Sequence, residues 1–146
     1  MDTQKQTHLV QFLPYFTPHI WGVEKVWEDI FLKWTYWKSF ILSGNICQQS
    51  DVYKKKVDNN MIYLFPCFEI VDNFIFPSIL TQKFWKVWKE CSQDIKNSNK
   101  NGEIKILTHT RFFLSSFMGW IFARKYKYDW IHLEHGSDYV KLSSPF

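Results

Sequence analysis

The sequence predicts an α/β fold in which helices cover both faces of a parallel sheet. Five short apolar segments alternate with longer segments of helical periodicity, which is the main observation behind this prediction. The 146 residues are enough for one domain, and 46% of them are hydrophobic, so the chain can bury a core. Parallel neighbours need a crossover element, usually a helix. The alternation therefore favours a Rossmann-like sheet.

Regular structure is expected to begin with an apolar strand and an amphipathic helix. Residues 8–16 (HLVQFLPYF) form an apolar run that predicts the first strand. The composition of residues 17–22 is typical of a loop. From residue 23 the apolar side chains recur at the spacing of one helix face. They are Val23, Val26, Trp27, Ile30, Phe31 and Trp34. We expect a helix over residues 23–34.

Two further strands are expected in the middle of the chain. Residues 39–46 and residues 61–66 are apolar runs of strand length. The polar stretch between them carries Lys54, Lys55 and Lys56 among acidic and amide residues, so it is interpreted as a solvated loop. Residues 67–76 are expected to be irregular.

The second half of the chain continues the alternation. Pro77 fits the first turn of a helix whose apolar face continues to Ile95 and which ends in the Asn-rich cluster at residues 97–102. A strand over residues 103–108, a helix over residues 113–126 and a fifth strand over residues 129–134 follow. Because the chain ends soon after this strand, we expect a single, incomplete domain over residues 1–146.

Charge and cysteine content exclude several classes of protein. Lys and Arg number 18 against 14 Asp and Glu, and the basic residues are scattered, so no nucleic-acid partner is expected. Three cysteines without a C-x-x-C pair predict neither a zinc site nor a disulfide framework, and favour a reducing, cytoplasmic compartment. Residues 112–123, the longest uncharged stretch, are shorter than the ~20 residues that span a bilayer. We expect no metal and no cofactor.

Polar residues follow three of the predicted strands, and the carboxyl ends of parallel strands meet at one edge of the sheet. The helix beginning at Val23 would direct its positive end at the first of these loops, where the backbone can approach an anion closely. The candidate residues are His19, Trp21 and Gly22 after the first strand, His109 and Arg111 after the fourth, and His135, Gly136 and Ser137 after the fifth.

More than one interpretation of these residues stays open. Gly22 suits a phosphate site, but it also suits a plain strand-to-helix turn, and the absence of G-x-G-x-x-G disfavours a dinucleotide site. His109 and His135 could bind a substrate hydroxyl or could each be structural. His132 and His135 are three apart near a strand and should point to opposite faces, which predicts no bound zinc.

Three segments resemble the amino-terminal domain of family-4 glycosyltransferases. They are VQFLPYFTPHIWGVEKVWEDI at residues 10–30, ILTHTRFFLSSFMGWIFARKY at residues 106–126, and IHLEHGSDYV at residues 131–140 with its EHGS element. The resemblance implies the GT-B architecture, in which two Rossmann-like domains face a cleft. It also implies transfer of a hexose from a nucleotide-sugar donor to an acceptor with retention at the anomeric carbon. The chain resembles the acceptor-side domain, and the carboxyl-terminal domain would be missing.

The resemblance also assigns roles and partners. Gly22 would lie near the donor phosphates and His135, the expected catalytic residue, would contact the transferred sugar, while His109 and Arg111 would line the acceptor side. A nucleotide sugar, a glycan or lipid-linked acceptor and the missing GT-B domain are the implied partners. Such enzymes often build cell-envelope polysaccharides, so peripheral contact with the inner face of the membrane is left open.

A non-catalytic module is the alternative function. The family usually has glycine where Trp21 stands, and a bulky side chain there restricts the backbone near the phosphates. One wall of the cleft cannot position donor and acceptor together, so we expect no transfer by this chain alone. An α/β binding or interaction module that has lost transfer would share these features.

Overall fold

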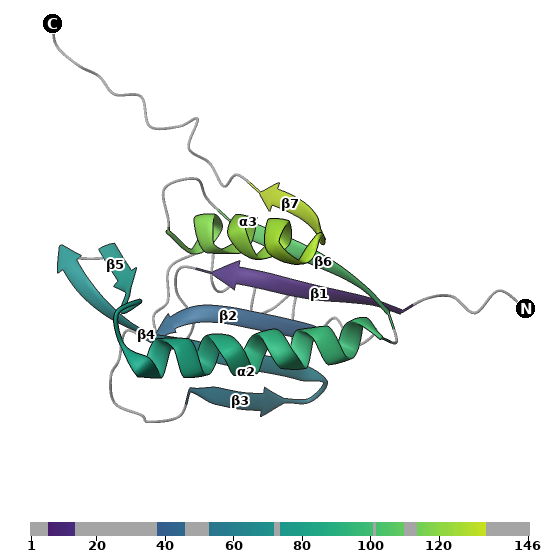
Figure 1. Cartoon of the computed structure of the whole chain (residues 1–146), viewed down its shortest axis with the longest axis horizontal. Coiled ribbons are helices and arrows are strands. Elements are labelled where there is room, and N and C mark those ends of the chain that lie inside the picture. The colour runs from purple at the N-terminus through teal and green to yellow at the C-terminus, as the bar shows by residue number, and fades with distance from the viewer. Residues whose placement is uncertain are drawn as a thin grey trace, which may run out of the picture.

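The computed structural model describes residues 6–13, 38–45, 53–71, 74–100, 102–109 and 114–133 of the chain (Figure 1). Strands and helices alternate along most of this sequence. The elements are β1 (Gln6–Leu13), β2 (Ser39–Asn45), β3 (Lys54–Val57), β4 (Asn60–Val71), β5 (Phe74–Pro77), α2 (Gln82–Asn99), β6 (Gly102–His109), α3 (Leu114–Tyr126) and β7 (Asp129–Leu133).

A single mixed sheet organises these elements. Its strands lie in the order β3-β4-β2-β1-β6-β7, and β5 pairs with the outer part of β4. The strands β1, β2, β4, β6 and β7 are parallel to their neighbours in that set, while β3 and β5 are antiparallel to β4. All five predicted strands are therefore confirmed, and their parallel pairing makes the fold α/β and Rossmann-like.

Strand β1 lies at the centre of the sheet because it has parallel partners on both sides. Val10 pairs with Phe40 of β2 and with Ile106 of β6, and all three side chains are buried. At the amino-terminal edge, Asn60 fastens β2 to β4, because its Oδ1 accepts hydrogen bonds from Ser39 N at 3.2 Å and Ser39 Oγ at 2.6 Å.

Both described helices lie on one face of the sheet, which is the near face in Figure 1. The connections β4–α2–β6 and β6–α3–β7 advance in the same direction across the sheet, and right-handed crossovers that advance the same way pass over the same face. Alternate strand residues point toward them. The resulting core contains Val10, Phe12, Phe40, Leu42, Tyr63, Phe65, Phe84, Val87, Cys91, Ile95, Ile104, Ile106, Phe122 and Ala123.

The second face of the sheet is buried as well. Leu13, Ile41 and Ile62 form a separate apolar cluster there, and Gln11 of the same face is fully buried. This burial fits a sheet whose strands carry apolar residues on both sides. The helix predicted over residues 23–34 lies outside the described residues.

Helix α2 begins later than its sequence indicates. Pro77 does not open the helix but ends β5, and the turn that follows leads to Thr81, whose Oγ1 accepts a hydrogen bond from Phe84 N at 3.3 Å. This contact satisfies one of the free backbone donors of the first turn. The helix then continues to Asn99, within the Asn-rich cluster at residues 97–102 where the sequence predicts its end.

Two predictions about the middle of the chain are wrong. The lysine run forms β3, an edge strand paired with β4, rather than a solvated loop. The described residues 67–71 and 74–76 are not irregular, because Cys67 pairs with Pro77 and Phe68 with Phe76 in a hairpin of β4 and β5. Pro66 ends the pairing of β4 with β2, opposite Asn45, and the chain continues past it as the β4–β5 hairpin.

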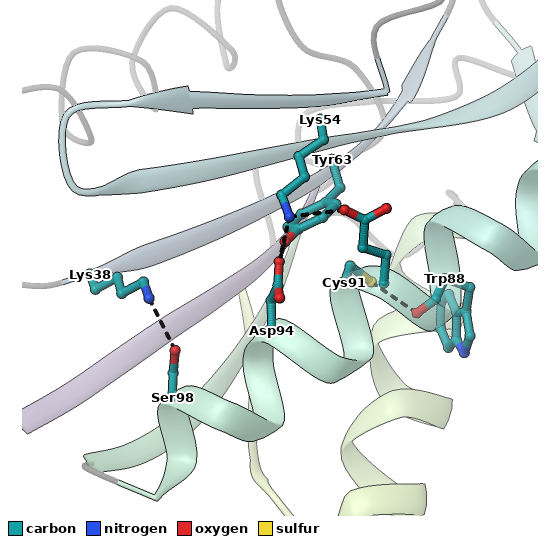
Figure 2. A network of polar contacts seen from close by, with 8 residues as sticks. Lys38, Lys54, Tyr63, Trp88, Cys91, Asp94 and Ser98 are labelled. Carbon is teal, nitrogen blue, oxygen red and sulfur yellow. Dashed lines mark hydrogen bonds and ion pairs between the residues drawn. The ribbon is translucent and has the colours of Figure 1, made fainter.

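A charged cluster joins β3 to α2 (Figure 2). Lys54 Nζ donates to Glu90 Oε1 at 2.9 Å and to Asp94 Oδ2 at 2.8 Å, and Tyr63 Oη donates to the same Asp94 oxygen. Lys38 binds α2 one turn further on, at Ser98 Oγ. These contacts fasten the helix to the outer strands.

Candidate functional site

The order of the strands places a candidate site at the carboxyl edge of the sheet. The chain runs from the central strand β1 to β2 and β4 on one side and later crosses to β6 and β7 on the other side. The direction in which successive strands are added therefore reverses between β1 and β6. In open parallel sheets, ligands bind in the crevice at such a switch point. Both α2 and α3 begin near this edge (Figure 1). The helix N-termini add free backbone N–H groups there.

A small pocket with a volume of about 30 Å³ opens at this edge. Its walls come from the ends of β1, β2 and β4, from the base of the β4–β5 hairpin and from the first turns of α3. The described lining residues are Phe12, Leu13, Leu42, Ser43, Gly44, Phe65, Cys67, Pro77, Leu114, Ser115 and Met118. Most of them are apolar, and Gly44 adds no side chain to the wall. A ligand here would be held mainly by shape and by a few polar groups.

Four polar side chains with buried atoms lie toward this end of the sheet, and two of them, Ser43 and Ser115, belong to residues that line the pocket. His109 Nε2 lies 3.2 Å from Gln11 Oε1, and both side chains are almost fully buried. Among the described residues, nothing bonds Gln11 Nε2, Ser43 Oγ or Ser115 Oγ, although each of these atoms is buried. Buried polar atoms normally have partners. These three can therefore donate to a ligand, and the two hydroxyls can also accept.

The structure gives His109 a defined environment. It is the last residue of β6, and Thr108 beside it pairs with Phe12, which brings His109 next to Leu13 at the end of β1. Its backbone O accepts a hydrogen bond from Ser116 Oγ of α3 at 2.7 Å. The prediction that His109 lies at the carboxyl edge is confirmed, and its side chain faces the sheet surface that also carries Gln11.

The other predicted site residues lie outside the described residues. Their positions relative to His109 are therefore not described, and their roles stay predictions. They are His19, Trp21, Gly22, Arg111, His135, Gly136 and Ser137.

Sequence reasoning missed the polar residues that lie inside strands. Gln11 stands between Val10 and Phe12 in an apolar run, and Ser43 occupies an inward position of β2. A polar residue at a buried strand position is itself a signal, because burying it without a partner costs free energy. The search for loop residues passed over this signal.

A second polar group lies on the opposite face of β6. Thr108 Oγ1 accepts a hydrogen bond from Trp130 Nε1 at 3.0 Å and lies 2.9 Å from His132 Nδ1. Within the described ranges, no three His, Cys, Asp or Glu side chains converge as a metal site would require. This group ties β7 to β6.

The charged cluster around Asp94 lies on the β3 side of α2 and is structural. Burial would raise the pKa of Asp94, but hydrogen bonds from Lys54 and Tyr63 outweigh it and hold this pKa below its usual value. Burial, with the nearby Asp94 carboxylate, raises the pKa of Tyr63. Each group is thus fixed in the protonation state that its partners require, and no proton is available for chemistry near neutral pH.

Comparison with known proteins points to one class of enzyme. No protein-family model matches the chain, and no solved structure gives a significant match. Over 148 aligned residues, the chain is 34% identical to an uncharacterized glycosyltransferase of Methanocaldococcus jannaschii. The match covers 97% of this chain and 36% of the relative, so the chain spans about a third of the length of the protein it matches. The chain is thus similar, over nearly all its length, to part of a protein named a glycosyltransferase.

Proposed function

We propose that this chain is the acceptor-side domain of a retaining, GT-B glycosyltransferase, which moves a sugar from a nucleotide-sugar donor to an acceptor. The observation that carries the proposal is the 34% identity to a named glycosyltransferase over 97% of the chain. The Rossmann-like sheet supports it, because its pocket lies at the carboxyl edge where such folds bind ligands. Since the chain spans a third of its relative, a second domain is part of the proposal.

In this proposal the pocket holds the acceptor. Ser115 of α3 lines it, and its buried hydroxyl, which has no partner among the described residues, would orient an acceptor hydroxyl for attack. His109 and Gln11 would support the same edge as a bonded pair. The donor would meet Gly22 and His135, which lie outside the described residues, and the second domain would grip its nucleotide.

The rate acceleration in this scheme comes from positioning and electrostatics. Holding two reactants in line converts a bimolecular step into an effectively unimolecular one, and aligned donors stabilise charge that develops on the departing phosphate. The described lining of the pocket carries no carboxylate. We therefore assign acceptor binding to this pocket, and assign stabilisation of the charge on the phosphate to the residues that contact the donor.

A complementation assay tests the proposal. The full chain is mixed with a glycan or lipid-linked acceptor and with a separate polypeptide that contains the region of the M. jannaschii relative not matched by this chain, and release of nucleotide from a panel of nucleotide sugars is measured. We expect release only when both polypeptides are present. Sugar binding without release, for every donor tried, would favour the non-catalytic module instead.

Serine variants in the same assay test the acceptor pocket. We expect Ser115→Ala to lower kcat/KM for the acceptor about tenfold, the equivalent of about one hydrogen bond. Ser92→Ala is the matched control, because Ser92 Oγ of α2 is also buried without a described partner but does not line the pocket. Equal losses in both variants would contradict the assignment of this pocket.

A further inference from the structure

We propose that a cavity at the amino-terminal edge of the sheet binds a small phosphate dianion, either free or esterified. The parallel strands begin at this edge, which lies on the right in Figure 1, so the cavity and the pocket described above are at opposite ends of the sheet. The cavity has a volume of about 370 Å³. Its described lining consists of Gln6, His8, Lys38, Lys56, Asn59 and Met61. We call it the amino-edge cavity.

The pairing of the strands places these side chains on one face of the sheet. Lys56 of β3 pairs with Met61 of β4, whose partner in β2 is Phe40. Lys38 lies two residues before Phe40, and His8 of β1 lies beside Lys38 in the same register. Side chains two residues apart in a strand share a face. All of them therefore point to the face that α2 covers, where Phe40 belongs to the core.

The amino-edge cavity carries positive charge that no acidic side chain balances. Lys38 and Lys56 both line it, and its described lining contains no carboxylate. Within the described ranges, neither lysine forms an ion pair. Lys38 Nζ donates to the neutral Ser98 Oγ at 3.2 Å, whereas Lys54 binds two carboxylates of α2 (Figure 2). Two ammonium groups at one cavity repel each other, and an anion bound there would offset this repulsion.

His8 adds a buried polar group beside these charges. The residue is 4% exposed, and its Nδ1 has no hydrogen-bond partner among the described residues. The Cδ2–Nε2 edge of the ring packs on Gly102 of β6, where an added Cβ would lie 2.7 Å from both atoms, so Nδ1 is on the side of the ring away from this glycine. Burial and the charge of Lys38 lower the pKa of His8. A protonated His8 thus lacks a counter-ion, which an anion in the cavity would supply.

The groups around the amino-edge cavity indicate the kind of anion. Lysine ammonium groups are common point-charge ligands of phosphate. The side-chain amides of Gln6 and Asn59 can donate further hydrogen bonds to its oxygens. The described lining contains no aromatic ring on which a nucleic-acid base could stack. A cation would be repelled by the two lysines. A small phosphate dianion fits this set of groups best.

Titration calorimetry of the full chain with sodium sulfate tests the cavity, with the ionic strength held constant by sodium chloride. Sulfate has the shape and charge of a phosphate dianion and keeps its charge over the pH range in which histidine titrates. We expect saturable binding of sulfate. Lys38→Gln and Lys56→Gln should each weaken it about tenfold, the equivalent of one hydrogen bond to a charged group. Lys56 is exposed, so its replacement leaves the fold intact.

Lys55→Gln is the matched control for Lys56→Gln, because it removes the same charge from the same strand. Lys55 pairs with Ile62, whose side chain lies in the apolar cluster on the other face of the sheet. We expect this variant to bind sulfate as the original chain does. Equal weakening by Lys55→Gln and Lys56→Gln would show that only the net charge matters, and would overturn the proposal.

A His8→Phe variant tests the contribution of the imidazole. In the original chain, sulfate should bind about tenfold more tightly at about pH 5 than at about pH 7, because a bound anion favours the protonated ring. The charged groups at the cavity, Lys38 and Lys56, are of a type that does not titrate in this interval. Glu103 and Lys105 of β6 face the other side of the sheet. The variant should lose the pH dependence, and a dependence that persisted would contradict the role of His8.

Inorganic phosphate and glucose 1-phosphate distinguish the two sources of the dianion. Tighter binding of inorganic phosphate would identify the free anion as the ligand, and tighter binding of the ester would identify a sugar phosphate. Chloride or acetate that bound as tightly as sulfate would overturn the proposal, and so would tighter binding of an oligonucleotide. The assay needs no sugar transfer and the cavity is remote from the pocket, so the result is independent of the proposed activity.

Discussion

Gly119 sets the distance between α3 and the sheet. A Cβ at this position would lie 2.3 Å from Thr108 Cγ2 and 3.0 Å from a ring carbon of Phe12, both in side chains that are almost fully buried. Neither group can move aside without disturbing the core. The close approach also keeps Thr108 between Trp130 and His132, which bond its hydroxyl.

Replacing this glycine should destabilise the protein despite the better helix propensity of alanine. We expect Gly119→Ala to lower the free energy of unfolding by about 1–3 kcal/mol, because α3 must move outward. Urea titration followed by circular dichroism measures the change. In an open position the same substitution would raise stability by up to about 1 kcal/mol. An increase in the free energy of unfolding would show that the space between α3 and the sheet can hold a methyl group at this position.

Single residues were the hardest part of the site to predict. His109 could be found because a polar residue at the end of a strand is visible in the sequence. Its partner Gln11 could not, because the pairing depends on how β1 and β6 align, with Gln11 opposite Leu107. Sequence spacing does not contain that register.

Among the elements, β3 shows how a short strand is held at the edge of a sheet. It has four residues and pairs with β4 alone, while Lys54 links it to Glu90 and Asp94 of α2. These side chains are about one-third exposed, so the ion pairs contribute modestly to stability. Their main effect is to join an edge strand to a helix.

Removing this link should loosen β3 selectively. We expect Lys54→Met to cost no more than about 1 kcal/mol of global stability but to speed amide hydrogen exchange in β3, because Glu90 and Asp94 lose their shared cation. Lys55→Met, an exposed neighbour in the same strand, is the control and should leave exchange unchanged. Equal exchange rates in the two variants would mean that the pairing with β4 alone holds the strand.

The error over β3 has a physical cause. Lysine is depleted from strands in general but enriched on exposed edges, where its charge prevents pairing with other chains. A run of three lysines therefore fits a loop and an edge strand equally well. The same holds for the β4–β5 hairpin, whose start is hidden by Pro66 because proline usually ends a strand.

At the scale of the whole molecule, the sequence predicted the parallel sheet correctly. Buried strands in such a sheet are continuous apolar runs, and helices show the spacing of one apolar face. Both kinds of element can therefore be recognised in the sequence. The order of the strands around β1 cannot be predicted from the sequence, because it depends on the side of β1 to which each crossover connection leads.

The stability of the whole fold should depend on pH through His8. Burial lowers the pKa of His8, and Lys38 nearby lowers it further. The unfolded chain therefore takes up a proton at a higher pH, near 6.5, than the folded protein does, so stability is lost as the pH falls below about 6.5. We expect the free energy of unfolding to decrease between about pH 7 and pH 5.

A His8→Phe variant isolates this contribution. We expect its unfolding free energy, measured by urea titration at several pH values, to fall less over the same interval than that of the original chain. His132→Phe, which changes a histidine on β7 that bonds Thr108, serves as the comparison. If the His8 variant kept the full slope, another group would be the source of the pH dependence.

The central position of β1 has a consequence for how the protein folds. One side of β1 pairs with β2, which follows it by about thirty residues. The other side pairs with β6, which comes much later in the sequence, with Val10 opposite Ile106. During synthesis, β1 therefore stays open along one edge until β6 has left the ribosome. Contacts so distant in sequence form slowly, since the intervening loop must close first. A nascent chain that ends before Gly102 would expose an apolar strand edge, so its survival would depend on chaperones.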